Sequence, residues 1–461
     1  MKSKFKGLLA LLLAFVLVLT ACGGDDDTST SGESTDTSTE TSESTGTETS
    51  ETTEGDDSLE GTISVQVEEG WQDYYNAAAE RVKANFPNVD FEFIVSGAFD
   101  HLDVLDQTDA TNEDVADLFA IPADRLYGLS DNEVLAAIDS QKLAEAIGGW
   151  DNFDDGIGGN FKVDDSYLAF PYNIETLITF VNTANAEANG IDASQPLEIA
   201  DIENGNTILL PLFDAWYGVA ATNAAEIELL GQGEDGALFS DLSVPWEELD
   251  PAKQEAINTI YEYWKLHDEA NDPLFDADAG WAFIDEVFTT GGEGVARLGG
   301  PWDTSIISEQ AGEGNLEIYP ISQLTLNGNP LTHWQGGWGL AVNARIEEDP
   351  VKMQIAEELI KEIVNPEFAV DLFEATGKVL ENVDTQVYAD SDLSDTDKKV
   401  IEATITSYQE APARPLFTEW GSVWDTWKNA ILSWNSVKPA TVEDAYTELQ
   451  ASFEAMMANF Q

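Results

Sequence analysis

The side chains with the most distinctive chemistry are tryptophans, several of which gather between residues 415 and 434. At about 100° per residue, five apolar residues of this stretch fall on one helical face. They are Trp420, Trp424, Trp427, Ile431 and Trp434. Indole is flat, large and seldom fully buried, so it suits a partner with apolar faces and hydroxylated edges, such as a pyranose sugar. We expect Trp427 and Trp434 to pack in the core, and Trp424, at the start of the helix, to contact a ligand.

Cysteine and histidine chemistry is sparse in this chain. Cys22 is the only cysteine, which excludes disulfides within the chain and metal sites built from cysteine. The three histidines, His101, His267 and His333, are too widely spaced to indicate a metal cluster or a histidine-based catalytic triad. We therefore predict no metal and no cofactor, and we expect each histidine to lie in the core or on the surface.

The first 22 residues have the pattern of an export signal. Three lysines lie within the first six residues, and the apolar run at 7–21 is too short to span a bilayer comfortably. Residues 19–22, Leu-Thr-Ala-Cys, resemble the lipobox of bacterial lipoproteins, in which the cysteine thiol receives diacylglycerol before cleavage. This implies a signal peptide at 1–22, a lipidated Cys22 and a chain anchored to the extracytoplasmic face of the cell membrane. An ordinary secretory signal that happens to carry a cysteine is the alternative.

The charge of the chain limits its partners. Residues 23–58 consist of Gly, Asp, Glu, Ser and Thr, so we expect a disordered, self-repelling tether. Of the 20 Lys and Arg and the 88 Asp and Glu, 17 and 75 lie beyond residue 60. This excess of acid argues against binding to nucleic acid or anionic lipid. No motif with calcium-binding spacing accompanies it.

From Gly61 onward, segments with strand and helix patterns alternate, as in an α/β fold of parallel β-α-β units. The expected strands are 62–67, 89–95, 115–120, 207–212, 294–298 and 336–342. The expected helices are 71–86, 99–109, 214–230, 251–268 and 281–288, with helices dominating from 349 to the end. The β-rich stretch 161–181 is long enough to pass from one domain to another. The chain length allows two or three domains.

Five segments, in chain order, resemble the solute-binding proteins of ABC importers, in particular their maltose/maltodextrin-binding branch. They are 115–128 with Ala123-Asp-Arg, 167–175 ending in Pro171-Tyr-Asn-Ile-Glu, 292–302 with Gly299-Gly-Pro-Trp, 336–343 with Gly-Gly-Trp-Gly-Leu-Ala-Val-Asn, and 414–427 with Arg-Pro and Trp-Asp-Thr-Trp. The resemblance implies an α/β clamshell like that of periplasmic binding proteins, with interdomain crossovers. One lobe would comprise 59–173 and 336–385, and the other 176–333 and 388–461. It further implies a monomeric, non-enzymatic receptor that passes an oligosaccharide, such as a maltodextrin, to a membrane permease.

Carried over residue by residue, the resemblance assigns nine side chains to the ligand, beside Trp424. They are Glu69, Trp71, Asp124, Arg125, Glu175, Phe213, Trp216, Trp302 and Trp338. A carboxylate next to a planar guanidinium can bind vicinal hydroxyls, although Asp124 and Arg125 also read as a surface ion pair. Phe213, Trp216 and Trp338 also read as core residues.

Three departures from the branch leave the identity of the sugar open. Ile121 stands where maltose binders often have tryptophan, the first loop has Gly70 and Trp71 where they often have a basic residue, and Lys428 replaces a frequent arginine. A lipid-anchored glycoside hydrolase is an alternative, and would need two carboxylates about 5–10 Å apart across a cleft. A receptor for a different solute on the same fold is another, while a surface adhesin fits the strand–helix alternation poorly.

Overall fold

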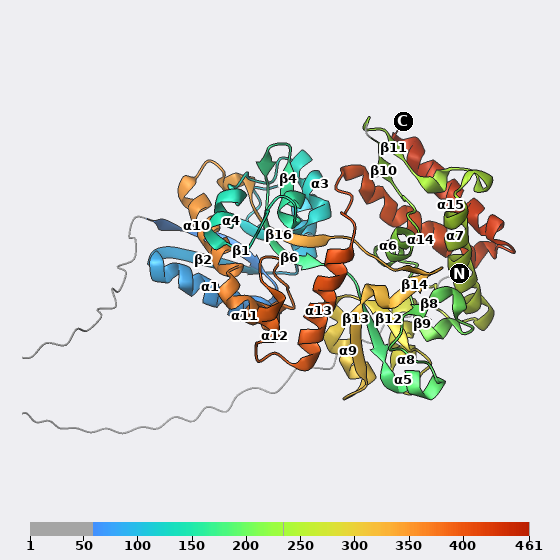
Figure 1. Ribbon diagram of the computed structural model, residues 1–461. Coiled ribbons are helices and arrows are strands. Elements are labelled where there is room, and N and C mark those ends of the chain that lie inside the picture. Colours follow the sequence, from blue (N-terminus) through green and yellow to red (C-terminus); the bar gives the residue numbers. More distant parts are fainter. Residues whose placement is uncertain (1–58, 234, 461) are drawn as a thin grey trace, which may run out of the picture. The chain divides into compact units, whose positions relative to one another are not determined.

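The computed structural model describes residues 59–233 and 235–460, which form two lobes with mixed sheets (Figure 1). The predicted signal peptide, Cys22 and the tether at 23–58 lie outside the described residues. None of the helices within the described ranges is long and apolar enough to cross a bilayer.

The first lobe is built on a five-stranded sheet with the order β2-β1-β3-β16-β6. Its strands are β1 (Glu60–Val67), β2 (Asn88–Val95), β3 (Leu118–Pro122), β6 (Phe170–Glu175) and β16 (Gly336–Val342). Strands β1, β2 and β3 are parallel, and helices α1 (Gln72–Asn85) and α2 (Ala98–Gln107) connect them. Strand β16 arrives from late in the chain and runs antiparallel to both β3 and β6. The carboxyl ends of β1, β2, β3 and β6 therefore share one edge of the sheet.

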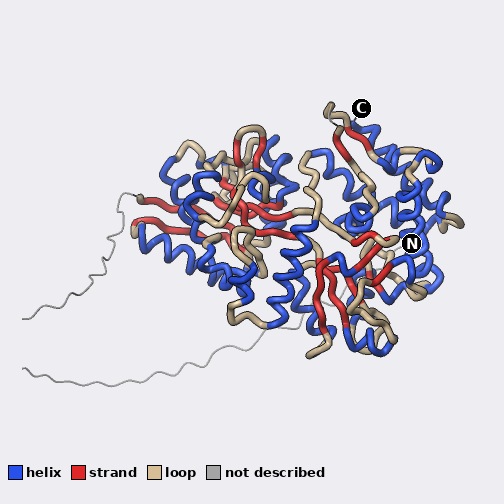
Figure 2. The backbone as a smooth tube through the Cα atoms, viewed as in Figure 1, coloured by secondary structure: helices blue, strands red, loops and turns tan. Residues whose placement is uncertain are grey.

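The second lobe contains a four-stranded sheet with the order β13-β7-β12-β9. Its strands are β7 (Ile178–Asn182), β9 (Ile208–Leu209), β12 (Ala296–Gly299) and β13 (Leu316–Pro320). Figure 2 shows its strands as a group separate from the five-stranded sheet. The helices of this half are α5 (Thr183–Asn189), α6 (Ala215–Ala224), α7 (Pro251–Ala270), α8 (Gly280–Phe288), α9 (Thr304–Ala311), α14 (Ser422–Val437) and α15 (Val442–Met457). A small sheet, β15-β14-β8, joins β8 (Leu197–Glu198), β14 (Leu324–Leu326) and β15 (Asn329–Pro330).

The chain passes between the two sheets more than once. Only two residues separate β6 from β7, so the first crossover is nearly direct. The second runs from β15 to β16, and Gln335 N donates to Pro412 O (2.9 Å) along the way. Helix α13 (Asp395–Glu410) contacts β13, β6 and β7, elements of both sheets (Figure 1). The predicted clamshell with crossovers is confirmed, while the lobe boundaries stay a prediction.

Four further helices cover the first lobe or lead out of it. They are α4 (Ser140–Ile147), α10 (Pro350–Ile363), α11 (Ala369–Thr376) and α12 (Thr385–Ala389). Helix α10 contacts α1 and β1, so segments nearly 300 residues apart cover the same part of the sheet. Short strands β4 (Lys162–Val163) and β5 (Ser166–Tyr167) and helix α3 (Leu126–Asp131) lie between β3 and β6 in the chain.

Two expected elements are shorter than their patterns predict. The strand expected at 207–212 ends at Leu209, because Leu210 N donates to the Tyr263 hydroxyl (2.9 Å) instead of to a neighbouring strand. The helix expected at 214–230 ends at Ala224, two residues before Glu226 adopts a positive φ of 54°. Such a conformation is incompatible with a continuing helix.

The glycines of β16 reflect close packing. A Cβ on Gly337 would lie 1.9 Å from Ile157 Cδ1, and one on Gly339 would lie 2.7 Å from Phe161 Cε1. Side chains alternate across a strand, so Trp338 between them points to the opposite face. The Gly-Gly-Trp-Gly run therefore lets one face accept packing side chains while the other presents an indole.

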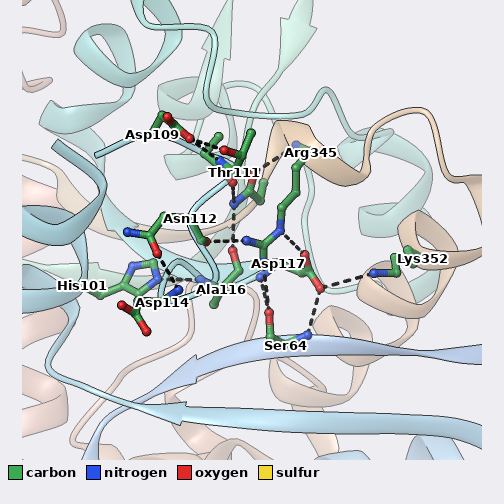
Figure 3. A network of polar contacts seen from close by, with 12 residues as sticks. Ser64, His101, Asp109, Thr111, Asn112, Asp114, Ala116, Asp117, Arg345 and Lys352 are labelled. Carbon is green, nitrogen blue, oxygen red and sulfur yellow. Dashed lines mark hydrogen bonds and ion pairs between the residues drawn. The ribbon is translucent and has the colours of Figure 1, made fainter. Parts of the chain in front are cut away.

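A polar network fixes the amino-terminal end of β3 (Figure 3). Arg345 Nε donates to Asp117 Oδ1 (2.6 Å), its Nη2 donates to Ser64 Oγ (3.1 Å), and its Nη1 donates to the Asn112 carbonyl (2.8 Å). Asp117 Oδ2 also accepts from Ser64 N (3.0 Å). Asp117 directly precedes β3, so the network ties β1, β3 and the segment after β16 together and holds in place the strand whose far end leads to Asp124.

Candidate ligand-binding cleft

A cavity of about 530 Å³ receives side chains from elements of both lobes. Its lining residues are Glu68, Trp71, Phe99, Pro122, Asp124, Glu175, Trp216, Trp302, Trp338, Thr376, Lys378, Arg414 and Trp424. About half lie at, or just after, the carboxyl end of a strand, where ligands bind in open α/β sheets. Glu68 follows β1, Asp124 follows β3, and Trp302 follows β12.

Seven of the ten side chains that the sequence assigns to a ligand line this cavity. They are Trp71, Asp124, Glu175, Trp216, Trp302, Trp338 and Trp424. The register of the first sheet explains part of this convergence, because Trp338 lies opposite Pro122, and Gly336 lies opposite Glu175. Whether these side chains contact a bound ligand stays a prediction.

The other three predicted residues do not line the cavity. Arg125 forms an ion pair with Asp106, because Ala123–Arg125 is a turn of 3-10 helix that points successive side chains in different directions. Glu69 is exposed in a similar short helix, and its neighbour Glu68 faces the cavity instead. Phe213 is 2% exposed and packs edge to face against Trp281 (5.4 Å). Their assignment to the ligand stays a prediction.

Trp424 and Trp216 form the aromatic wall of the second lobe. Their ring centroids lie 6.4 Å apart with an interplanar angle of 40°. Two buried indoles support Trp424 from behind, with centroids at 4.8 Å (Trp420) and 6.1 Å (Trp334). His333 is fully buried, and its Nε2 lies 2.8 Å from the Trp216 carbonyl oxygen. Both cleft indoles thus have little freedom to reorient.

The other tryptophans of α14 lie in the core, as predicted. Trp427 and Trp434 are at most 1% exposed. The Trp427 Nε1 donates to the Leu212 carbonyl (2.7 Å), and the Trp434 Nε1 donates to the Ala445 carbonyl (3.0 Å). One helix therefore supplies indoles to the core along its length and a single indole to the cleft at its beginning.

Trp338 and Phe99 belong to the facing wall in the first lobe. Their rings meet edge to face at 5.2 Å, and Phe99 remains 59% exposed. Trp338 is nearly buried, and its Nε1 donates to Glu175 Oε1 (3.0 Å). This bond fixes the indole and leaves the second oxygen of the Glu175 carboxylate available to accept from a ligand.

Trp302 is the most exposed indole of the cleft, at 49%. It is the second residue of the short helix Pro301–Asp303 and lies across Gly300, where an added Cβ would be 2.2 Å from the Trp302 Cζ2. Asp303 Oδ2 accepts from Gly300 N (3.2 Å) and closes this turn. Burial raises the pKa of the Asp303 carboxyl. Trp302 thus lies at the start of a helix directly after Gly299-Gly-Pro, and its contact with a ligand stays a prediction.

Arg414 joins the charged and aromatic parts of the cleft. Its Nη2 lies 3.1 Å from Asp124 Oδ2, and its side chain is 4% exposed. The guanidinium carbon lies 5.1 Å from the Trp216 ring, 5.5 Å from Trp334 and 5.9 Å from Trp424. Asp124 leads out of a first-lobe strand, whereas the indoles belong to the second-lobe wall, so one cation contacts both.

Six lining residues were not among the sequence predictions. They are Glu68, Phe99, Pro122, Thr376, Lys378 and Arg414. Glu68 and Phe99 come shortly after parallel strands, and this position could have indicated that they line the cleft. Arg414 belongs to the segment 414–427, which resembles solute-binding proteins. Lys378 follows helix α11 and carries no sequence signal of this kind.

No histidine is among the described residues that line the cavity. His101 and His267 are buried elsewhere, and within 59–233 and 235–460 no group of three or more His, Cys, Asp or Glu residues could hold a metal ion. Burial, with a smaller contribution from Arg345, lowers the pKa of His101 to about 4. The cleft can therefore bind through stacking, hydrogen bonds and charge.

Fold and cleft define a two-lobed binding protein, and the comparison with known families agrees. Residues 77–400 match the family described as bacterial extracellular solute-binding protein, and the chain belongs to this family. It is accordingly a solute-binding protein of an ABC importer, a receptor without catalytic activity. No curated protein sequence is significantly similar to the chain.

Several solved structures share the fold. The maltose-binding periplasmic protein MalE from Listeria monocytogenes, in complex with maltose, gives a TM-score of 0.65 at 19% identity over 87% of this chain and 98% of that one. MalX from Streptococcus pneumoniae, with maltopentaose, gives 0.64 at 16% identity over 85% and 99%. The GacH receptor of Streptomyces glaucescens, solved unliganded and with acarbose, gives 0.64 at 17% identity over 87% and 100%. At such identities the similarity establishes the fold.

Proposed function

We propose that this receptor captures an oligosaccharide of the maltodextrin type between its lobes and delivers it to a membrane permease. The observation that carries the proposal is the convergence of indoles from both lobes on one cavity that also contains carboxylates. Trp216 and Trp424 lie on one wall, and Trp71 and Trp338 on the other. Stacking suits the apolar faces of sugar rings, and carboxylates accept hydrogen bonds from their hydroxyls.

The size and energetics of the cleft support an oligosaccharide. A volume of about 530 Å³ lies within the range of small-molecule sites. A dissociation constant of about 1 μM needs only about 8 kcal/mol of net binding free energy. Two or three stacks and several hydrogen bonds can supply that amount, because aromatic contacts contribute about 0.5–1.5 kcal/mol beyond area burial. Structural neighbours solved with maltose and maltopentaose add to this support.

Closure of the lobes would complete the site. Domain closure around a ligand is a common motion of two-lobed binding proteins, and the crossovers between β6 and β7 and between β15 and β16 provide the hinges. Closing expels water and strengthens each polar contact inside, since electrostatic interactions grow as the local dielectric constant falls. The closed, liganded receptor would then be the form that docks on the permease.

A tryptophan-fluorescence titration tests the proposal. The chain lacking residues 1–22 is titrated with glucose, maltose, maltotriose, cyclodextrin, lactose and xylobiose. We expect saturable quenching with a maltodextrin and an affinity about 10-fold lower for Trp302→Ala, equivalent to about 1.4 kcal/mol. Trp246→Ala is the matched control, since this indole packs on Tyr446 outside the cavity. Absence of quenching by every sugar would favour a different solute and reject the proposal.

We also propose that Cys22 carries the lipid anchor and that residues 23–58 tether the receptor to the membrane. The lipobox-like Leu-Thr-Ala-Cys sequence supports this proposal. Two or more acyl chains give stable anchoring, and a tether raises the local concentration of receptor at its permease. In cells grown with labelled palmitate, the wild-type chain should be labelled and should sediment with membranes. Cys22→Ser should be unlabelled, and equal membrane association of the two would contradict the anchor.

A further inference from the structure

Lys378 is the one lysine among the cavity-lining residues, and its ammonium group has an unusual environment. The Nζ lies 5.0 Å from the ring centroid of Trp338, 5.4 Å from Trp71 and 5.9 Å from Tyr172. Within the described ranges, no hydrogen bond or ion pair joins this Nζ to another side chain or to the backbone. Aromatic faces stabilise the cation but accept none of its three protons in a conventional hydrogen bond.

The backbone holds Lys378 firmly in this position. Gly377, with φ of +69°, ends helix α11 in the left-handed conformation and turns the chain toward the cleft. Lys378 N donates to Thr376 Oγ1 (3.1 Å). On the other side, Ile174 N donates to the Val379 carbonyl (3.0 Å), which pins the next residue to β6. The lysine therefore projects from a segment fixed at both ends.

Two carboxylates act on the charge of Lys378 without pairing with it. Burial lowers the pKa of Lys378, and Glu175 and Glu68, which line the same cavity, oppose this shift by favouring the charged form. Neither approaches the Nζ to within ion-pair distance. A sugar hydroxyl can both accept and donate a hydrogen bond, so it can bridge an ammonium and a carboxylate that do not meet directly.

We propose that Lys378 is a specificity-determining residue that donates to the hydroxyl or ring oxygens of a neutral sugar unit seated against Trp71 and Trp338. Glu68 and Glu175 accept from hydroxyls of the same unit. A carboxylate on the sugar would only accept hydrogen bonds and would face two like charges beside one ammonium. The subsite therefore selects neutral glycans over uronic acids. This inference rests on the proposed function, because it names the ligand chemistry of the same cleft.

Substitution of Lys378 tests the inference with maltotriose as the probe. Lys378→Met keeps the length of the stem and removes the charge, and we expect the dissociation constant to rise about 10- to 100-fold. Lys378→Arg retains the charge and should lose less affinity for maltotriose. Lys142→Met, at an exposed position of α4 outside the cavity, is the matched control and should bind as the wild type does. Calorimetric titration measures the affinities, and thermal unfolding checks that each variant is folded.

The second arm compares maltotriose with its derivative in which one C6 hydroxyl is oxidised to a carboxylate. We expect the wild type to bind the neutral sugar at least 10-fold more tightly, and Glu68→Gln to narrow that preference. If wild type binds maltotriose and Lys378→Met binds it equally well, the inference fails while the proposed function stands. Equal or tighter binding of the acidic derivative also overturns the inference. If the wild type binds no sugar, both are overturned.

Discussion

Arg414→Met should affect both the stability of the protein and its affinity for a solute, and the two effects can be measured separately. The substitution removes an ion pair of 3.1 Å with Asp124 and three guanidinium–indole contacts. Methionine preserves most of the apolar stem that packs among the tryptophans. Asp124 would remain in the cavity without its cationic partner.

The magnitude follows from the burial of the two partners. Removing one member of a buried ion pair costs roughly 3–5 kcal/mol. Asp124 retains 27% side-chain exposure and stays partly hydrated, so the lower end, about 3 kcal/mol, applies. The indole contacts lie close to the 6 Å limit, and their loss of about 0.5 kcal/mol each is partly offset by new methionine contacts. Unfolding entropies of about 2.1 cal/mol/K per residue, over roughly 400 residues, convert 3 kcal/mol to a decrease in Tm of about 4 °C.

Thermal unfolding with and without maltotriose measures both effects. We expect Arg414→Met to lower the Tm by about 4 °C and to weaken sugar binding about 10-fold, because Asp124 loses the group that orients it. Arg81→Met is the matched control. Arg81 pairs with Glu362 (2.8 Å) and lies 3.8 Å over the Phe368 ring, but it is not a cavity residue. The reasoning is refuted if Arg414→Met unfolds within 1 °C of wild type, or if Arg81→Met weakens binding equally.

Three further changes have directions fixed by the structure. Gly300→Ala puts a Cβ about 2.2 Å from the Trp302 indole, so the ring must move aside, and maltotriose quenching should weaken while the Tm stays the same. The pKa of His101 is about 4, against about 6.5 unfolded, so the unfolded chain takes up the proton first. Stability should therefore fall between about pH 6.5 and 4, by at most about 3 kcal/mol from this residue, as urea midpoints would measure. Burial lowers the pKa of Lys378, so maltotriose affinity should decrease with rising pH before surface lysines titrate.

Control variants distinguish these specific effects on binding and pH dependence from a general loss of folding. Gly128→Ala adds a Cβ with nothing within 4 Å and should leave quenching unchanged. His101→Gln keeps an acceptor for the Ala116 amide and should make the acid branch shallower, while buried His333, whose pKa burial lowers to about 3, keeps its own contribution. An unchanged acid branch would count against this role of His101. The Lys378→Arg variant should bind maltotriose with an affinity that does not change with pH in this range, because a guanidinium stays charged. Tyr172, which faces the lysine, stays neutral because burial raises its pKa well above the usual value. An alkaline decrease retained in Lys378→Arg would assign the titration to another group.

The sequence could predict which elements supply the cleft, because position after a strand is a local property. Asp124 and Trp302 follow strands that their own patterns identify, and both line the cavity. It could not predict side-chain direction within a short turn. Asp124 and Arg125 are adjacent, yet the 3-10 helix sends one into the cavity and the other to Asp106. A pattern of residue types contains no information on that rotation.

Contacts between segments far apart in the chain could not be predicted from the sequence either. Arg414 meets Asp124 across 290 positions, and the encounter depends on how the two lobes fold against their crossovers. Three aromatic rings surround the Lys378 ammonium group, those of Trp71 after β1, Tyr172 in β6 and Trp338 in β16. In the sequence, none of these residues carries a signal that it lies near a lysine. Only the sheet order β1-β3-β16-β6 brings them to the same edge.

The two walls of the cleft differ in chemistry, and we expect this difference to separate the affinity for the proposed sugar ligand from selectivity among sugars. The second lobe contributes Trp216, Trp302 and Trp424, whose stacking tolerates many sugars because every pyranose has an apolar face. The first lobe contributes the charged groups Glu68, Glu175 and Lys378. We expect these groups to distinguish hydrogen-bond donors from acceptors on a bound sugar. Truncating an indole of the second wall should therefore weaken all bound sugars by similar factors. Changing a charged group of the first wall should alter their ranking, because a buried polar group without a partner costs about 1–3 kcal/mol only for sugars that leave it unpaired.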